Sequence, residues 1–585
     1  MSNNRLEWHT LLPDTATFTS IFEQQWNGLY LENIAAVQPR LFDSLSQLQR
    51  TTAPFPLLLL KNAESHDAQQ LLAHVIAEIA PENTTSQGGR YDWNDNRFQF
   101  TPEPTADSPF STLSGSVQIA DWIEEEQLFG ALRSTSSGFQ LQPGLVHQAN
   151  GGTLILPLRT LLLQPRMWLR LRQMLMQQRF EWLSQDERTP LPISVAPMPL
   201  HLRLVLTGDR DALADFQESE PELCADALYS EYEEDWQITD HEDGEAWYQW
   251  VHSIAQMHNF ADLEADIWPV LFREGVRYTG DQQTLPLCYR WLLRQLRDAQ
   301  LAGEALNAEN LEIAVATREW RESFLAERVQ DEILLDQVRI ETEGEAVGQI
   351  NGLSVLEVPG HPRPFGEPSR LSCVVHIGDG EFMDVERKAE LGGNLHAKGM
   401  MIMQAWLMSE LELEQQLPFS ASIVFEQSYS EVDGDSASLA ELCALISALT
   451  LHPIKQSIAV TGSIDQFGNV QSIGGINEKI EGFFNLCEIR GLTGQQGVIL
   501  PASNVRHLCL KSSVVDAVRE GKFHLWAIDS VEEALILLTG KCWQNDDQAV
   551  PALIDDIQER ISQFNQPDPR HRPWILRWLN WFNHN

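Results

Sequence analysis

The chain has 585 residues and a formal net charge of −42, from 41 basic and 83 acidic side chains. This length predicts about three or four domains, which excludes a peptide hormone or a small disulfide-stapled module. So acidic a surface would repel phosphate groups, and we therefore expect neither nucleic acid nor anionic lipid as a partner.

The seven cysteines lie far apart in the sequence and form no C-x-x-C pair. This usage is typical of a reducing compartment and argues against a disulfide framework or a zinc site. The N-terminal segment MSNNRLEWHTLLPD lacks the apolar core of a signal peptide, and no apolar run approaches the roughly 18 residues of a membrane span. We expect a cytoplasmic protein with no membrane contact and no bound metal.

Residues 1–50 have the pattern of a helical N-terminal extension. An α/β domain is predicted over 51–246, because short buried-strand candidates alternate with amphipathic helices, as in a parallel doubly wound sheet. Residues 83–145 are rich in Asn, Thr, Ser, Gly and Pro, and we expect them to be dominated by loops. The strand candidates are apolar runs at 54–60, 151–158 and 201–208.

The character of the sequence changes twice in its second half. Residues 247–338 have helical periodicity, whereas 339–541 mix β-branched segments, glycines and helices, which predicts a separate α+β domain. The tail, 542–585, ends in the aromatic and basic run RHRPWILRWLNWFNHN. The segment 211–245 holds no Lys or Arg; a solvated loop or helix face is the common outcome, and a role in partner binding stays open.

A P-loop nucleotide site would lie where the strand at 54–60 meets the next helix. Such a loop needs glycines for close backbone approach to phosphate, a lysine for its charge and a hydroxyl for Mg²⁺. The loop KNAESHDAQQ has no glycine, no lysine at the helix start, and two acids, Glu64 and Asp67. The strand at 151–158 ends in Pro157 and Leu158 instead of an acidic pair. We therefore predict no cofactor and no ATP hydrolysis, although generic strands unrelated to nucleotide binding would give the same pattern.

The segment SYSEVDGDSASLAELCALISALT predicts a strand end, a glycine-containing turn and a helix that begins at Ser436. Free N–H groups and the positive end of the helix dipole could stabilise an oxyanion beside that serine. An ordinary Asp/Ser N-cap is the commoner explanation of such a tetrapeptide taken alone.

The segment VTGSIDQFGNVQSIGGINEKIEGFFNL predicts a hairpin that leads through Gly474 and Gly475 into a helix carrying Lys479. A lysine can serve as the base for a serine nucleophile if burial lowers its pKa. Apolar side chains beside Lys479, at Ile476, Ile480 and Phe483, would provide such burial. The alternative is a surface lysine on an amphipathic helix.

Both segments match one family. From about 339 to 540 the sequence resembles the proteolytic domain of Lon proteases, closest to the B-type of archaea, in VGQINGLSVLEV, VERKAELGGNLHAKGMMIM, EVDGDSAS, AVTGSIDQFGNVQSIGGINEKIEG and GVILPASN. The resemblance implies that Ser436 is the nucleophile and that Lys479, 43 residues later, is its base. It also implies that Asp433 and Thr461 contact the lysine. His396, in LGGNLHAKG, is interpreted as structural, because no acid follows it at an informative spacing.

The resemblance extends upstream through HQANGGTLIL, HLRLVLTGDRD and 247–330. It implies a degenerate P-loop AAA+-like α/β domain over 51–246 and a helical lid at 247–338, followed by an α+β Lon-type proteolytic domain. The resemblance implies a serine endopeptidase that cleaves protein or peptide substrates, unfolded ones in the family's manner, as a homo-oligomer of six copies. Two alternatives stay open: an ATP-dependent Lon protease that binds nucleotide unconventionally, and a non-catalytic scaffold or adaptor.

Overall fold

The computed structural model describes residues 4–565 except 52, 54, 81–85, 104–106, 114, 137, 185–187, 379, 412–416, 429–433 and 545–551. The chain divides into two compact units. Unit 1 comprises Met1–Thr19, Glu264–Leu285 and Asp298–Asn585, and unit 2 comprises Ser20–Leu263 and Pro286–Arg297. Within the described ranges, no helix has the length and apolar character needed to cross a membrane.

Unit 2 is built on a parallel sheet of five strands in the order β14-β1-β13-β9-β6. Side chains on the central strands are buried on both faces, as expected where helices cover the two sides of a parallel sheet. The predicted doubly wound α/β architecture is therefore confirmed, with all three predicted strands present. The strands are β1 (Leu57–Lys61), β6 (Val117–Ile119), β9 (Thr153–Pro157), β13 (Arg203–Gly208) and β14 (Leu228–Glu231).

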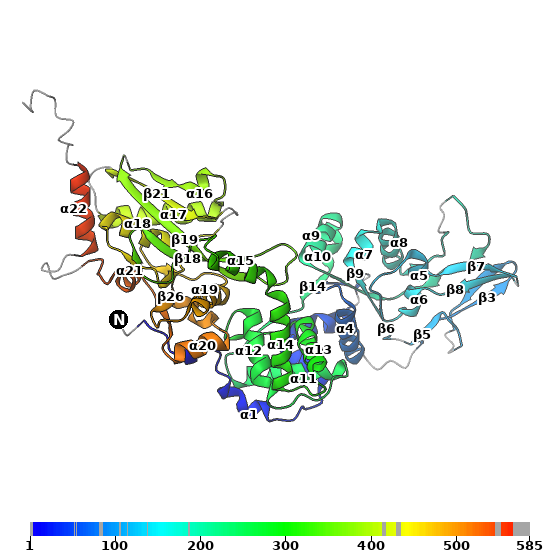
Figure 1. Cartoon of the computed structure of the whole chain (residues 1–585). Coiled ribbons are helices and arrows are strands. Elements are labelled where there is room, and N and C mark those ends of the chain that lie inside the picture. Colours follow the sequence, from blue (N-terminus) through cyan, green and yellow to red (C-terminus); the bar gives the residue numbers. More distant parts are fainter. Residues whose placement is uncertain are drawn as a thin grey trace, which may run out of the picture. The chain divides into compact units, whose positions relative to one another are not determined.

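The expectation that 83–145 is dominated by loops is wrong. Two hairpins, β3–β4 (Arg90–Asn94, Arg97–Thr101) and β7–β8 (Ala131–Thr135, Gly138–Gln142), lie together at one end of unit 2 (Figure 1). The strands are short, and the polar residues that suggested loops form the hairpin turns: Asp95 and Asn96 adopt φ of 48° and 59°, as a tight hairpin turn requires. Further short strands are β2 (Ser86–Gly88) and β5 (Ser111–Leu113).

Helices account for most of the remaining chain up to residue 334. Residues 247–338, predicted to be helical, contribute to α11, α12, α13, α14 and α15 (His241–Met257, Ile267–Thr279, Tyr289–Ala302, Ala308–Glu322, Phe324–Leu334). In unit 2 the helices include α3 (Pro39–Arg50), α4 (His66–Ile79), α7 (Leu158–Leu162), α8 (Pro165–Met176) and α9 (Arg210–Ser219).

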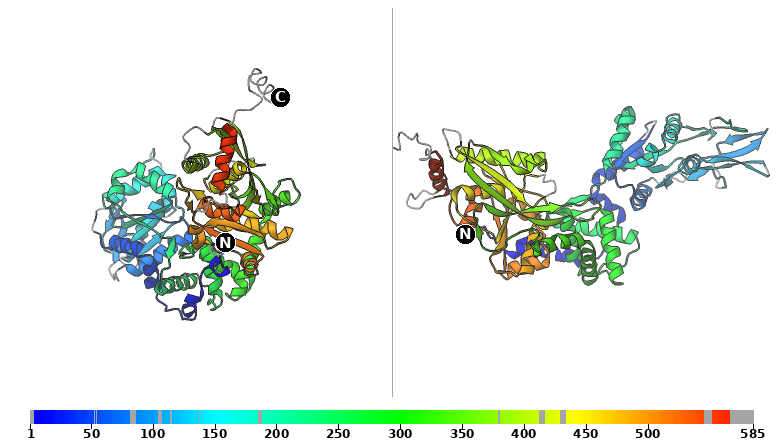
Figure 2. Two further views of the ribbon diagram at one scale, coloured as in Figure 1. Left: turned by 90° about the vertical axis from the view of Figure 1, so that its left-hand side faces the viewer. Right: turned by 45° about the horizontal axis from the view of Figure 1, so that its top comes forward.

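Unit 1 is built on a mixed sheet of seven strands in the order β20-β21-β19-β18-β23-β26-β27 (Figures 1 and 2). Antiparallel pairing joins β18 to β19 and β19 to β21, whereas β18, β23, β26 and β27 pair in parallel. The strands are β18 (Gln349–Leu356), β19 (Phe365–Ile377), β20 (Phe382–Asp384), β21 (Phe419–Glu426), β23 (Ile458–Val460), β26 (Gln496–Pro501) and β27 (Phe523–Ile528). The predicted α+β character of this region is confirmed.

The central helix of unit 1 is α18 (Ser438–Thr450), whose side chains from Ser438 to Leu449 are all buried. Its sequence, SLAELCALISALT, has small or apolar residues on every side, which is typical of a helix enclosed by other elements. The elements that contact it include β19, α17 (Asn394–Leu411), α21 (Val531–Thr539) and α22 (Leu553–Asn565).

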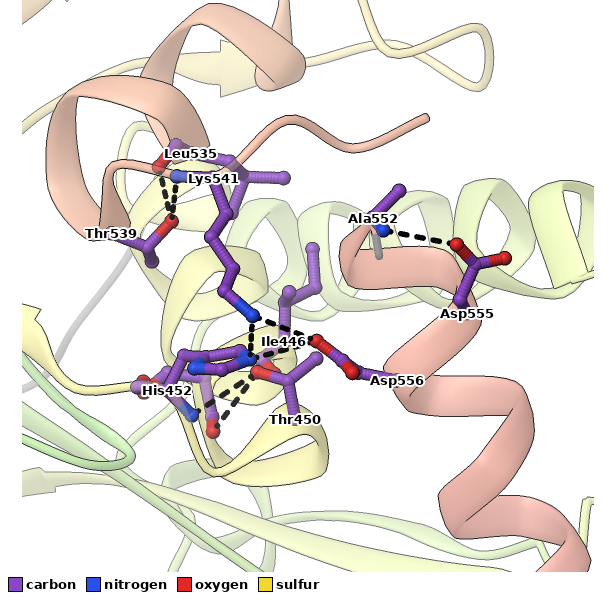
Figure 3. A network of polar contacts seen from close by, with 10 residues as sticks. Ile446, Thr450, His452, Leu535, Thr539, Lys541, Ala552, Asp555 and Asp556 are labelled. Atoms are coloured by element: carbon purple, nitrogen blue, oxygen red, sulfur yellow. Dashed lines mark hydrogen bonds and ion pairs between the residues drawn. The ribbon is translucent and has the colours of Figure 1, made fainter. Parts of the chain in front are cut away.

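Both ends of the described chain pack on unit 1. Leu6 N donates to Leu525 O and Ala527 N donates to Asn4 O, both at 2.8 Å, beside the edge strand β27. At the other end, α22 lies against α18, where Asp556 Oδ2 lies 2.7 Å from His452 Nε2 and 3.2 Å from Lys541 Nζ (Figure 3). The aromatic and basic run of the tail, from residue 566 on, lies outside the described residues.

Candidate active site

Ser436 lies in the turn that precedes α18. The helix begins at Ser438, two residues later than predicted, because Gly434 adopts φ of 139° and Ser438 N donates to Asp435 O to close the turn. Ser436 is partly exposed. Its carbonyl oxygen accepts from Gly462 N at 2.9 Å, which ties the turn to the segment after β23.

Lys479 lies in the first half of α19 (Ile476–Arg490), which begins directly after Gly475 in the left-handed conformation. Its side chain is only 4% exposed and is surrounded by apolar residues, of which Ile480 and Phe483 are completely buried. Lys479 Nζ donates to Ser436 Oγ at 2.9 Å. The structure therefore brings together the serine and the lysine that the sequence singled out.

Thr461 connects the two residues. It is fully buried, and its backbone N–H donates to Ile499 O on β26, which holds it at the end of the sheet. Its Oγ1 donates to Ser436 O at 3.4 Å and accepts from Lys479 Nζ at 3.4 Å. The expected contact of Thr461 with the lysine is thus present in the geometry. Asp433, the other expected contact, lies outside the described residues.

The environment of Lys479 favours its neutral form. Burial lowers the pKa of the amine from 10.5 to about 8, while the negative charge of Asp435 acts in the opposite direction. Asp435 was missed by the sequence reasoning, although its position directly before Ser436 was a usable signal. An amine with a pKa near 8, within hydrogen-bond distance of a hydroxyl, can exchange a proton with it near neutral pH.

Polar side chains on α19 anchor the helix on both sides of Lys479. Asn477 Nδ2 donates to His507 O at 2.9 Å and its Oδ1 accepts from Cys509 N at 2.8 Å. Glu481 is buried and accepts from the two terminal nitrogens of Arg277, Nη1 and Nη2, at 2.8 and 3.2 Å. Asn477 and Glu481 hold α19 in place, and neither forms a hydrogen bond with Ser436. The sequence analysis did not single them out, although each lies two residues from Lys479.

Glycines make the contact between α19 and β19. A Cβ added to Gly366, at the start of β19, would lie 1.9 Å from Glu478 O, and one added to Gly482 would lie 2.3 Å from Gly366 O. Real Cβ atoms never come so close to a carbonyl, so only glycine permits this approach of strand and helix. The distance between α19 and β19, and with it the position of Lys479, therefore depends on Gly366 and Gly482.

His396 is buried between two carboxylates, so the absence of an acid at an informative spacing was misleading. Its Nε2 lies 3.2 Å from Asp384 Oδ2, twelve residues earlier, and its Nδ1 lies 3.6 Å from Glu441 Oε1 on α18. Folding, not sequence proximity, assembles this group. No group of three or more metal-ligating side chains with metal-binding geometry is found in the part of the chain that the structure describes.

In unit 2 the loop between β1 and α4 is held by contacts with residues of neighbouring elements. Glu64 Oε1 accepts from the backbone N–H of Arg159 at 3.1 Å, and the Arg159 guanidinium lies between Glu64 and Asp209, at 3.6 and 3.5 Å. Lys61, before the loop, pairs with Glu234 at 3.2 Å. The Glu64 carboxylate thus accepts from a backbone N–H group and lies beside a guanidinium, two kinds of group that also bind phosphate in proteins.

Comparison with known proteins agrees with both halves of this description. Residues 113–225 match a LonB-like AAA domain, and residues 426–539 match the Lon protease (S16) C-terminal proteolytic domain.

The chain is 55% identical, over the whole of both sequences, to the "Putative Lon protease homolog" of Escherichia coli (strain K12). It is 41% identical to the protein of the same name from Haemophilus influenzae, over 92% of this chain and 89% of that one. The "Archaeal Lon protease" of Archaeoglobus fulgidus is 24% identical over 69% of this chain and 63% of its own. The chain therefore belongs to the Lon protease family, with an AAA-like domain followed by a Lon proteolytic domain.

Proposed function

We propose that the protein is a serine endopeptidase in which Ser436 is the nucleophile and Lys479 the general base. The observation that carries the proposal is the 2.9 Å contact between Lys479 Nζ and Ser436 Oγ, made by a lysine that is 4% exposed. Burial that lowers the pKa of Lys479 to about 8 gives the base a useful neutral fraction near physiological pH.

The reaction follows from the positions of the two groups. Neutral Lys479 accepts the hydroxyl proton as Ser436 Oγ attacks the peptide carbonyl carbon. The resulting ammonium gives that proton to the leaving amine as the C–N bond breaks, which leaves an ester on Ser436. Lys479 then deprotonates a water molecule that attacks the ester, and the returned proton restores the serine hydroxyl.

The turn that carries Ser436 also supplies candidate oxyanion donors. Within the described part of the chain, the backbone N–H groups of Ser436 and Ala437 have no hydrogen-bond acceptor. They lie just before the N-terminus of α18, where the helix dipole also favours negative charge. We assign these two N–H groups as the donors that stabilise the negative charge on the carbonyl oxygen of the tetrahedral intermediate.

The proposal includes the loss of ATP hydrolysis. The Glu64–Arg159–Asp209 contacts replace a phosphate-binding loop, and β9 ends in Pro157 where an acidic pair would be needed. We therefore expect cleavage without nucleotide and without powered unfolding. From the family we further infer protein or peptide substrates, a cytoplasmic site of action and a homo-oligomer of six copies, whose number sedimentation velocity would measure.

The direct test is degradation of casein, an unfolded substrate, with and without Mg·ATP. Wild type should cleave casein at similar rates in both conditions, and Ser436→Ala should be inactive. Ser513→Ala, a change of an exposed serine on α20 (Ser512–Arg519), is the matched control and should behave as wild type. Equal cleavage by wild type and Ser436→Ala would refute Ser436 as the nucleophile, and no cleavage by wild type would support the scaffold alternative. Strict ATP dependence would support unconventional nucleotide binding.

A further inference from the structure

The group around His396 connects α17, which carries His396, with α18, the helix that follows the turn of Ser436. His396 is 3% exposed, and Glu441 is 1% exposed and lies in the first turn of α18. A third acid, Glu386, is also buried and accepts from Phe425 N on β21 at 3.0 Å. Three carboxylates from different elements thus surround one imidazole.

The negative charges of these carboxylates make their burial depend on the imidazole of His396. Buried carboxylates are costly unless a cation or hydrogen-bond donors compensate them. Burial alone would lower the pKa of His396, but its contact with Asp384 and the charges of Glu441 and Glu386 outweigh burial and raise it. Burial also raises the pKa of Glu441 to about 7, although His396 opposes that shift. The Asp384 and Glu441 carboxylates thus favour the protonated form of His396, which lies between them.

The same helix that carries His396 supports the nucleophile turn. Gly399, three residues after His396 in α17, packs on the turn so closely that an added Cβ would lie 3.2 Å from Asp435 Cβ and 3.5 Å from Ser438 Cβ. These two residues flank the Ser436–Ala437 pair. Any shift of the first turn of α17 would be transmitted directly to the serine.

We propose that His396 is a positioning residue for Ser436: by joining Asp384 to Glu441 it sets α17 against the turn that carries the nucleophile. The inference rests on the proposed function of Ser436 but adds a residue outside the Ser436–Lys479–Thr461 contacts. It predicts that the reactivity of the serine hydroxyl changes when the His396 contacts are removed, even in chains that stay folded.

The experiment measures the rate at which diisopropyl fluorophosphate labels Ser436; Oγ bonds to phosphorus and fluoride leaves, so peptide binding plays no part. His396→Gln should slow labelling about tenfold, the scale expected of a displaced reacting group. Adding Glu441→Gln should restore part of the rate, because one uncompensated carboxylate is removed. His452→Gln is the matched control: it changes a histidine–carboxylate pair at the far end of α18 and should label within about twofold of wild type.

Gly399→Ala separates positioning from stability. The added methyl group would lie 3.2 Å from Asp435 Cβ, so it should displace Asp435 and slow labelling at least about threefold. Thermal unfolding of the same variant shows whether the chain stays folded at the assay temperature. This variant decides the question if His396→Gln does not fold. Wild-type labelling rates in folded His396→Gln, or in Gly399→Ala, would overturn the inference. Absence of labelling at Ser436 in wild type would instead overturn the proposed function, and this inference with it.

Discussion

The pH profile of peptide cleavage tests the environment of Lys479. With the pKa of Lys479 lowered to about 8, roughly one molecule in ten holds the neutral amine at pH 7. An ordinary lysine of pKa 10.5 would hold it in only about one molecule in 3,000. We therefore expect kcat/KM for a fluorogenic peptide to rise about tenfold between pH 7 and a plateau above pH 9.

The same shift should appear in stability. Lowering the pKa from 10.5 to about 8 corresponds to about 3 kcal/mol, and Lys479 is buried enough for this conversion. Between those two pH values the unfolded chain holds the proton and the folded chain does not, so stability rises with pH across this window. Urea unfolding from pH 7 to 10 should show wild type gaining up to about 3 kcal/mol relative to Lys479→Met, with a constant difference below pH 7.

Two variants and a control complete the test. Asp435→Asn removes the charge that raises the pKa of Lys479, so the midpoint of the rate profile should move below its wild-type value. Glu488→Gln removes an exposed carboxylate on the same helix and should leave the midpoint unchanged. Lys479→Arg should be inactive, because a guanidinium does not give up its proton. A wild-type midpoint near 10, or an active Lys479→Arg with an unchanged profile, would refute the assignment of Lys479 as base.

Three further changes test other contacts. Thr461→Val removes the hydroxyl that meets both Ser436 and Lys479, so kcat should fall about tenfold with little change in melting temperature; a wild-type kcat would remove Thr461 from the site. Gly482→Ala forces a methyl group against Gly366 O and should cost about 2 kcal/mol or more in urea unfolding, whereas an unchanged midpoint would show that α19 can move. Asp556→Asn should cost about 1 kcal/mol at pH 7. Its contacts lower the pKa of Asp556, so this stabilisation is present above about pH 4 and lost as the pH falls further; a cost that persisted at pH 2 would contradict that account.

Resemblance to one family, carried by two short segments, predicted the Ser436–Lys479 pair better than its surroundings. Ser436 and Lys479 are each preceded by glycines at a turn, and such turns leave a readable signal in a short segment. The partners of His396 leave none, because Asp384 and Glu441 reach it from other elements through the tertiary fold. A role for Asp435 in the site could have been predicted from its place beside Ser436. Its effect on the pKa of Lys479 could not, because the two residues come together only when α19 packs against the turn.

The architecture shows the same division. Long apolar runs such as β1 and β9 were predicted because strands buried on both faces are apolar throughout. The hairpins within 83–145 were missed because their strands are only five residues long and largely exposed. Polar neighbours in the sequence conceal the contribution of Tyr91 and Phe98 to a core. The start of α18 was misplaced because the Gly434 turn continues through Ala437 before regular helical bonding begins.

The contacts between distant segments of unit 1 have a consequence for the order of folding. Asn4 and Leu6 pair with residues of β27 that lie more than five hundred positions later in the sequence. The helix α18 ends at Thr450, whereas α22, which contacts it, begins at Leu553. Contacts between segments so far apart form slowly, because the entropy of loop closure opposes them until they are made. The helix that follows Ser436 is therefore fully enclosed only late in the folding of unit 1.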